Sequence, residues 1–316
     1  MSKQSKIYIA GHRGMVGSAC WRALEGAGYV NLVGKTSKEL DLRNQALVDD
    51  FIATEKPDVI IDAAAKVGGI LANDTYPYEF LMDNMLIQNN LIRAAHDYDV
   101  PKFIFLGSSC IYPKMAPQPL KEEYLLTDSL EPTNEWYAIA KISGVKLIEA
   151  LRKGYNRDYV SLMPTNLYGP NDNFDLKSSH VLPAMIRKFH EAKLNDHSDV
   201  ELWGTGSPMR EFLHVDDLAS AVLFALVNEL DEPLYNVGTG LDLTIKELAL
   251  LVQEITGHRG QIVWDKAKPD GTPRKLLNVS RLNARGWRST IDLSFGVNAT
   301  YNWYLNQGEV RTVKGP

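Results

Sequence analysis

Short apolar runs alternate with longer stretches of helical periodicity through the first half of the chain. The predicted strands have four or five residues and are almost wholly apolar, as expected of strands buried on both faces of a parallel sheet. They cover residues 6–10, 31–34, 58–62, 103–107 and 159–163. Because helical patterns separate most of these strands, we expect crossover helices between them, which predicts an α/β fold around a doubly wound parallel sheet.

From about Asn171 the pattern changes, because Pro, Gly and charged residues interrupt the helices. Residues 203–208 and 268–273 form loops of a kind that contacts ligands more often than it fills a core. The strands expected here are short, and the two expected helices begin with good capping residues. The expected strands cover residues 200–203, 235–237 and 261–264, and the expected helices cover residues 216–227 and 244–255.

This change of pattern predicts two domains. The first covers residues 1–170 and receives the chain again near residues 210–240, whereas residues 171–209 and 241–316 form a second, smaller α/β domain. Since the sequence contains no internal repeat and no low-complexity linker, we expect the two domains to exchange chain rather than to follow one another.

Composition and charge exclude several classes of protein. Hydrophobic residues make up 45% of the 316 residues and charged residues 23%, which excludes disordered and fibrous chains. The net charge of −5 without a dense basic run gives no footprint for nucleic acid or an anionic membrane. No apolar run approaches the ~18 residues of a membrane helix.

Cysteine usage and the amino terminus bear on the compartment. Cys20 and Cys110 are the only cysteines, too few for a disulfide framework, and we predict no metal site. The first residues lead directly into a strand without a signal-type apolar segment. The expected location is therefore the cytoplasm.

A glycine-rich turn follows the first predicted strand and opens a helix. Glycines there permit a positive φ and a close backbone approach to a pyrophosphate, while the helix amino terminus offers free N–H groups. The turn has the GxxGxxG pattern of a dinucleotide site, although a tight turn without a ligand is the alternative. Its residues are Gly11, His12, Arg13, Gly14, Met15, Val16 and Gly17.

The end of the second predicted strand favours NADP(H) over NAD(H). It lacks the acidic residue that binds the ribose hydroxyls of NAD, and cations and hydroxyls follow instead, suited to a 2′-phosphate. The alternative is that Lys35 and Lys38 only solvate a loop. The residues assigned to this adenosine end are Arg13, Lys35, Ser37, Asp41 and Leu42.

Tyr137 and Lys141 form a candidate catalytic pair. Their spacing places a phenol and an amine one turn apart on the same helix face. We expect the ammonium to lower the phenol pKa from its usual value of about 10. Ser108 follows the fourth predicted strand, where its hydroxyl can hold a substrate carbonyl oxygen. Together, this hydroxyl, the Tyr137–Lys141 pair and the glycine-rich turn indicate a nucleotide-dependent oxidoreductase.

Five motifs in order resemble the extended short-chain dehydrogenase/reductase family over nearly the whole chain. They cover residues 11–17, 63–69, 108–114, 164–170 and 209–217. The resemblance implies a Rossmann-type sheet domain that binds NADP(H), a smaller substrate-binding domain and, typically, a homodimer. Within this family, the motifs resemble most closely those of the members that epimerise carbons 3 and 5 of GDP-4-keto-6-deoxy-D-mannose and reduce carbon 4 to give GDP-L-fucose.

The resemblance also implies roles for individual residues. Cys110 would be the base and His180 the acid of the epimerisation, with Ser108, Tyr137 and Lys141 serving the reduction. From the local sequence alone, a buried packing role for Cys110 and a phosphate or capping role for His180 carry equal weight. The implied cofactor contacts also include Leu106, Gly107, Lys141, Pro164, Thr165, Asn166, Leu167 and His180, and the implied substrate contacts are Lys188, Trp203, Arg210, Asp270 and Lys275.

Two other functions fit the same fold. A nucleotide-sugar 4,6-dehydratase or 4-epimerase regenerates its cofactor, but the dehydratases carry an acidic pair where this chain has Ser109 and Cys110. A non-catalytic NADP-sensing protein would not need Ser108, Tyr137 and Lys141.

Lys35 and Ser37 stand where related enzymes often have arginines, so the NADPH preference is expected to rest mainly on Arg13.

Overall fold

The structure is a computed structural model that describes residues 1–196, 198–268 and 270–307. The last residues of the predicted second domain, 308–316, lie outside this part. Within it, no helix is long and apolar enough to cross a membrane.

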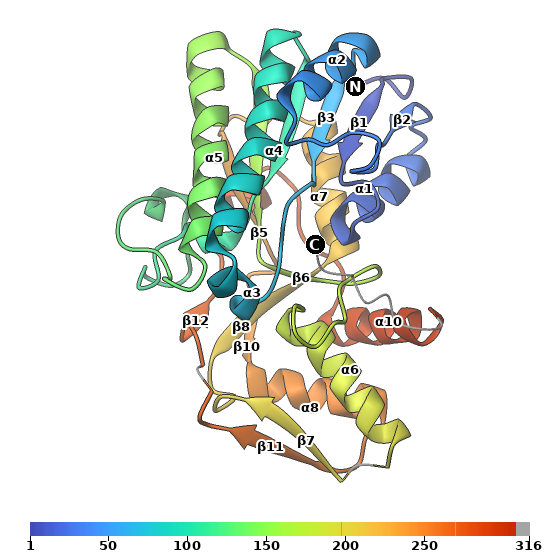
Figure 1. Cartoon of the computed structure of the whole chain (residues 1–316), viewed down its shortest axis with the longest axis vertical. Helices are drawn as coiled ribbons and strands as arrows, with labels where there is room; N and C mark the ends of the chain where they lie inside the picture. The colour runs from blue at the N-terminus through green and yellow to red at the C-terminus, as the bar shows by residue number, and fades with distance from the viewer. Residues whose placement is uncertain (197, 269, 308–316) are drawn as a thin grey trace.

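A six-stranded parallel sheet forms the upper half of the molecule (Figure 1). Neighbouring strands are β2 (Leu32–Val33), β1 (Ile7–Ala10), β3 (Val59–Asp62), β4 (Lys102–Leu106), β5 (Asp158–Pro164) and β9 (Leu234–Val237). From β1 the chain first goes outward to β2 and then returns to β3 on the other side. A crevice at the carboxyl ends of β1 and β3 is the usual ligand site of such a sheet.

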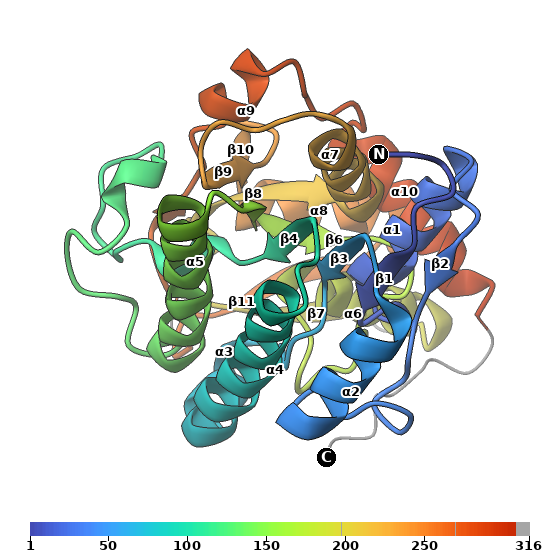
Figure 2. The same ribbon diagram turned by 90° about the horizontal axis from the view of Figure 1, so that it is seen from above.

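Helices cover both faces of this sheet, as Figure 2 shows. One face packs against α1 (Met15–Gly26) and α7 (Val215–Val227), and the other against α2 (Gln45–Glu55), α4 (Pro77–Asp97) and α5 (Glu135–Tyr155). Successive strand residues alternate between these two cores, so the strands had to be apolar throughout. The predicted doubly wound α/β fold is confirmed.

A smaller group of elements lies below the sheet (Figure 1). Strand β8 (Met209–His214) pairs with β10 (Asp242–Thr244), β12 (Arg274–Lys275) and β6 (Asn166–Tyr168), while β7 (Asp199–Trp203) pairs with β11 (Gln261–Asp265). Helices α6 (Val181–Leu194), α8 (Ile245–Thr256) and α10 (Leu293–Leu305) complete a third core. Helix α8 begins with a capping box between Thr244 and Glu247.

The chain passes repeatedly between the two groups of elements. Helix α9 (Ser280–Ala284) contacts β9, and Leu282 and Trp287 join the core of the parallel sheet. Both residues fall within the second domain that the sequence predicts. The domain boundaries stay a prediction.

Candidate active site

The glycine turn joins β1 to α1 and brings backbone close to backbone. Gly11 has a φ of +75°, and a Cβ there would lie 2.8 Å from the carbonyl oxygen of Ala63. A Cβ at Gly17 would overlap the Gly11 carbonyl, so only glycine lets α1 begin this close to β1. No side chain caps this helix at Gly14. The turn therefore leaves the N–H groups of the first helical turn, at Met15 and Val16, for an anionic ligand.

Charged side chains gather at the end of β2, where the adenosine part of a dinucleotide is expected. Burial and the neighbouring Arg13 guanidinium lower the pKa of His12, whose ring packs against Gly34. Hydrogen bonds from Thr36, with Lys35 and Arg13 nearby, lower the pKa of Glu39. Arg13 and Lys35 are thus close together, but the sequence analysis missed the carboxylate of Glu39 beside them.

The three other residues assigned to this end differ in their surroundings. Asp41 is engaged with the Arg43 guanidinium at 2.9 Å. Leu42 packs against the core, and its carbonyl accepts a hydrogen bond from Asn90 Nδ2 at 2.8 Å. Ser37 is exposed. The ion pair with Arg43 therefore already uses part of the hydrogen-bonding capacity of the Asp41 carboxylate.

Tyr137 and Lys141 of α5 both lie against the end of β4. Lys141 is 2% exposed, and its Nζ donates a hydrogen bond of 2.9 Å to the Leu106 carbonyl. This Nζ lies 4.7 Å from the ring centroid of Phe105 and 5.9 Å from that of Tyr137. The structure therefore brings phenol, ammonium and strand end together.

The pKa of Tyr137 differs from the expectation. Burial raises it well above the usual value, and Cys110 and Asp62 raise it further. Lys141 gives its hydrogen bond to Leu106, and burial lowers its own pKa. Desolvation is the largest cause of this rise, so Tyr137 is a neutral phenol, the protonation state of a proton donor.

Ser108 and Cys110 stand at the turn after β4, where the short helix η1 (Ser109–Ile111) begins. Ser108 Oγ accepts a hydrogen bond of 3.4 Å from the Cys110 amide. Cys110 is 7% exposed, and burial raises the pKa of its thiol. Lys275, the Ser108 hydrogen bond and Lys141 oppose this rise, with Lys275 the strongest of the three.

His180 precedes α6 and is open to solvent. Crowding of the imidazole by protein atoms and the charge of Lys275 lower its pKa. Its side chain makes no capping hydrogen bond to α6. Of the alternatives that the sequence left open, the capping role of His180 is therefore wrong in this structure.

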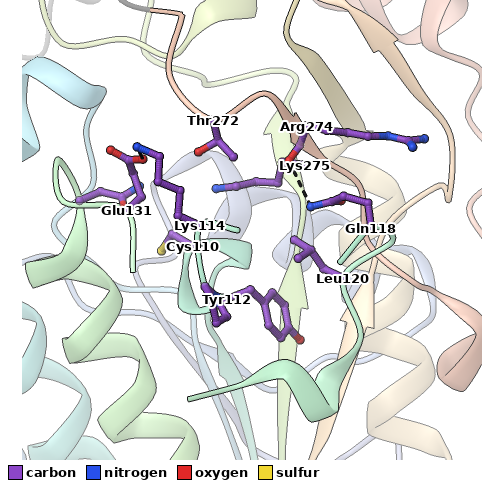
Figure 3. Close-up of a pocket in the computed structure, with 11 residues that line it drawn as sticks. Cys110, Tyr112, Lys114, Gln118, Leu120, Glu131, Thr272, Arg274 and Lys275 are labelled. Atoms are coloured by element: carbon purple, nitrogen blue, oxygen red, sulfur yellow. Dashed lines mark hydrogen bonds and ion pairs between the residues drawn. The ribbon is translucent and has the colours of Figure 1, made fainter. Parts of the chain in front are cut away.

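A small pocket is lined by Cys110 on one side and by Arg274 and Lys275 of β12 on another (Figure 3). Lys275 points into it, whereas Arg274 points away. Across the pocket Lys114 pairs with Glu131 at 2.7 Å. Neither residue could be assigned to the site from the sequence. Lys114 is one residue of a longer motif, and Glu131 is a carboxylate in a loop, so neither suggests a functional role by itself.

The implied substrate residues fall into two groups. Arg210 and Lys275 are register partners on β8 and β12, so two cations lie side by side next to the Cys110 pocket. Trp203, at the end of β7, is 53% exposed, and Asp270 accepts a hydrogen bond of 2.7 Å from the Thr205 amide. Lys188 Nζ instead donates to the carbonyl of Glu201 at 2.8 Å.

The expected cofactor-lining residues follow the ends of β4 and β5. A Cβ at Gly107, next to Leu106, would overlap the Met163 side chain, so the backbone is tightly packed there. Beyond Pro164 and before Leu167, the side chains of Thr165 and Asn166 donate to the Glu211 carbonyl at 3.3 and 2.7 Å. These two side chains join β6 to β8.

Fold and site together define a dinucleotide-dependent enzyme of the extended short-chain dehydrogenase/reductase type. The sequence pattern of the NAD dependent epimerase/dehydratase family matches residues 7–238, and the chain belongs to this family. The resemblance predicted from the motifs is thereby confirmed.

Individual relatives match over almost their whole length. The chain is 57% identical over 303 residues to "GDP-L-fucose synthase 1" of Arabidopsis thaliana, covering 96% of this chain and 94% of the relative. It is 54% identical over 321 residues to "GDP-L-fucose synthase" of Escherichia coli (strain K12), covering 98% and 100%. The solved structure of "MlghC, GDP-mannoheptose C4 reductase from Campylobacter jejuni with NADP bound" matches with a TM-score of 0.89 at 38% identity, covering 96% and 99%.

Proposed function

We propose that this chain converts GDP-4-keto-6-deoxy-D-mannose to GDP-L-fucose with NADPH, by 3,5-epimerisation followed by 4-reduction. The observation that carries the proposal is a cysteine and a histidine within electrostatic reach of one lysine, beside the Ser108–Tyr137–Lys141 group. An enzyme that only reduces the ketone would not need the pair of Cys110 and His180. Relatives named GDP-L-fucose synthase, at 54% and 57% identity, support the same substrate.

The site fits a phosphorylated dinucleotide. The close-packed glycine turn and the uncapped start of α1 suit a pyrophosphate, and Arg13 with Lys35 suits a 2′-phosphate. A relative whose structure holds NADP supports the assignment. When bound, NADPH supplies the hydride for the reduction.

Epimerisation needs a base and an acid on opposite faces of the sugar. The Cys110 thiolate removes the proton from a carbon next to the ketone, which leaves an enolate, and protonated His180 returns a proton to the other face. Lys275 favours the thiolate against burial. His180 then regains its proton from solvent, to which it is open, and Cys110 releases the proton it took to solvent before the next exchange. The same exchange serves each of the two carbons.

Reduction uses the second group of side chains. The Tyr137 phenol donates its proton to the carbon-4 oxygen as the hydride reaches carbon 4, and the Ser108 hydroxyl holds that oxygen. A neutral Tyr137 is the form this direction of reaction requires. Lys141 lies beside the phenol and neutralises charge as it develops there.

Binding of the nucleotide would use the smaller group of elements. Arg210 and Lys275 present adjacent positive charges suited to a diphosphate. The exposed face of Trp203 offers a stacking surface for a base. Lys188 and Asp270 support these contacts through the backbone groups they hold.

We also propose a homodimer located in the cytoplasm. Helix α4 exposes Tyr78, Met82 and Leu86 at intervals of one turn, and α5 exposes large apolar side chains such as Ile139 and Leu147. Apolar faces on two adjacent helices suit a four-helix bundle with a second copy. Both cysteines are free and buried, as suits a reducing compartment.

The decisive experiment mixes the purified protein with NADPH and GDP-4-keto-6-deoxy-D-mannose. One NADPH oxidised for each GDP-L-fucose formed supports the proposal. A changed sugar without net NADPH oxidation would instead indicate a cofactor-recycling epimerase or dehydratase, and NADPH binding without turnover would indicate a sensing role.

A further inference from the structure

Strand β3 ends in a buried carboxylate that the reaction described above does not use. Asp62 follows three apolar residues and has no exposed surface. Its Oδ1 accepts a hydrogen bond of 3.2 Å from the Ala64 amide, but its Oδ2 has no hydrogen-bond partner among the described residues. A buried carboxylate with an unsatisfied oxygen is costly unless a nearby charge compensates for its lost hydration.

Strand register and packing place the Lys141 ammonium close to this carboxylate. Asp62 is the register partner of Phe105 on β4, and Lys141 Nζ lies 4.7 Å from the centroid of the Phe105 ring. The same Nζ donates to the carbonyl of Leu106, the next residue of that strand. The Asp62 carboxyl group at the end of β3 and the Lys141 ammonium at the end of β4 therefore lie at neighbouring strand ends, in the layer between the sheet and α5.

The charges of the two side chains favour each other. Burial raises the pKa of Asp62 to about 6, and Lys141 opposes that rise. Burial lowers the pKa of Lys141, and Asp62 and then Cys110 oppose the fall. The other titratable groups that sense Asp62 are the phenols of Tyr8 on β1 and Tyr137 on α5, whose pKa values it raises.

We propose that Asp62 is a positioning residue whose carboxylate acts as the counter-ion of Lys141, keeping that ammonium charged beside Tyr137. The inference rests on the proposed function for its effect on catalysis, because Lys141 and Tyr137 act in the reduction. The electrostatic interaction between Asp62 and Lys141 involves only the chain's own residues. Above a pH of about 6 the carboxylate is ionised and holds the ammonium, and below it the counter-ion is lost.

The first test measures the electrostatic interaction between Asp62 and Lys141 without substrate or cofactor. The Asp62 carboxyl carbon is followed by NMR through a pH titration in the parent protein and in Lys141→Met. Removing the ammonium should raise the carboxyl pKa above its parent value by about one unit or more. An unchanged value would overturn the inference, whether or not the chain makes GDP-L-fucose.

The second test measures the effect on the reduction. In Asp62→Asn the ammonium lacks its counter-ion, so the pKa of Lys141 falls, and the alkaline loss of NADPH oxidation should move down by about one pH unit or more. The control is Ser161→Ala. Ser161 lies on β5 as the register partner of Phe105 on β4, and its fully buried oxygen also has no hydrogen-bond partner among the described residues. The pH profile of this control should match the parent.

The two tests separate the two proposals. If the parent protein does not oxidise NADPH with the GDP-sugar, the proposed function fails while the NMR titration still decides the electrostatic interaction. If the parent is active and Asp62→Asn keeps the parent pH profile, Asp62 has no positioning role. If Asp62→Asn does not fold, the titration of Lys141→Met alone decides.

Discussion

Lys275 of β12 shares a small pocket with Cys110 of η1, and its ammonium is the strongest influence opposing the rise in thiol pKa that burial causes. The same ammonium lowers the pKa of His180. One cation thus favours both a thiolate and a neutral imidazole. Removing it should therefore weaken Cys110 as the proposed base, whereas it should favour the protonated form of His180 that the proposed acid step uses.

We predict that Lys275→Met raises the pKa of Cys110 further, because the thiolate loses the positive charge that most strongly favours it. Alkylation of Cys110 by iodoacetamide, followed by mass spectrometry, should then need a higher pH for half-maximal rate. Arg274→Met is the matched control, since Arg274 lies next to Lys275 on β12 but pairs with Asp242 of β10 and points away from the pocket. Equal pH midpoints in Lys275→Met and the parent would contradict the prediction.

We predict that Tyr137→Phe lowers NADPH oxidation by roughly 10²-fold or more, the usual effect of removing a proton donor. NADPH binding should stay close to the parent value. Tyr155→Phe is the control, because Tyr155 is an exposed tyrosine at the end of the same helix. Normal turnover by Tyr137→Phe would remove Tyr137 from the reaction.

We predict that the parent binds NADPH more tightly than NADH and that Arg13→Ala weakens NADPH binding by about tenfold or more, from loss of a charged contact to the 2′-phosphate. NADH binding should change little. Arg22→Ala is the control, since Arg22 lies on α1 but pairs with Asp216. Cofactor fluorescence gives the dissociation constants, and equal parent values for the two cofactors would defeat this prediction.

Most of the fold could be predicted because its elements depend on local patterns. The strands of the sheet are buried on both faces, so their residues are mostly apolar, and the predicted ranges lie within two residues of the observed ends. Strands β6, β8, β10 and β12 of the smaller group of elements were missed. The last of these, β12, is only Arg274–Lys275, and its pairing with β8 depends on residues distant in the chain.

The candidate site was predictable in identity but not in electrostatics. Motifs pointed to Tyr137, Lys141 and Cys110, but a sequence does not give desolvation, which raises rather than lowers the pKa of Tyr137. Asp62 had a signal, since a carboxylate closes an otherwise apolar strand. Its approach to Lys141 depends on how α5 packs on the sheet, which no local pattern reports.

We predict that the parent is a dimer and that Met82→Glu combined with Ile139→Glu makes it a monomer, because charges then replace exposed apolar residues of α4 and α5. Sedimentation at micromolar concentration measures the mass. Leu241→Glu is the control, since Leu241 is 75% exposed in a loop away from these helices. A parent protein that sediments only at 35.4 kDa would rule out the dimer.

The last prediction separates the two reactions of one pocket. Cys110→Ser replaces the proposed base with a hydroxyl that ionises far less readily, since an ordinary thiol has a pKa of about 8.5. Solvent deuterium should therefore no longer enter carbons 3 and 5 of the sugar. Hydride transfer does not need the thiol, so Ser108, Tyr137 and NADPH should still reduce some unepimerised ketone.

His180→Asn is the complementary variant, because it removes the proposed acid and leaves the base. Cys110 can still take protons, so exchange with deuterium should continue to some degree, but return of the proton to the opposite face should fail and the inverted product should be lost. Cys20→Ser is the control, since Cys20 lies on the buried face of α1 and does not line the pocket. If Cys110→Ser exchanges deuterium and forms GDP-L-fucose at the parent rate, Cys110 is a packing residue and the base is another group.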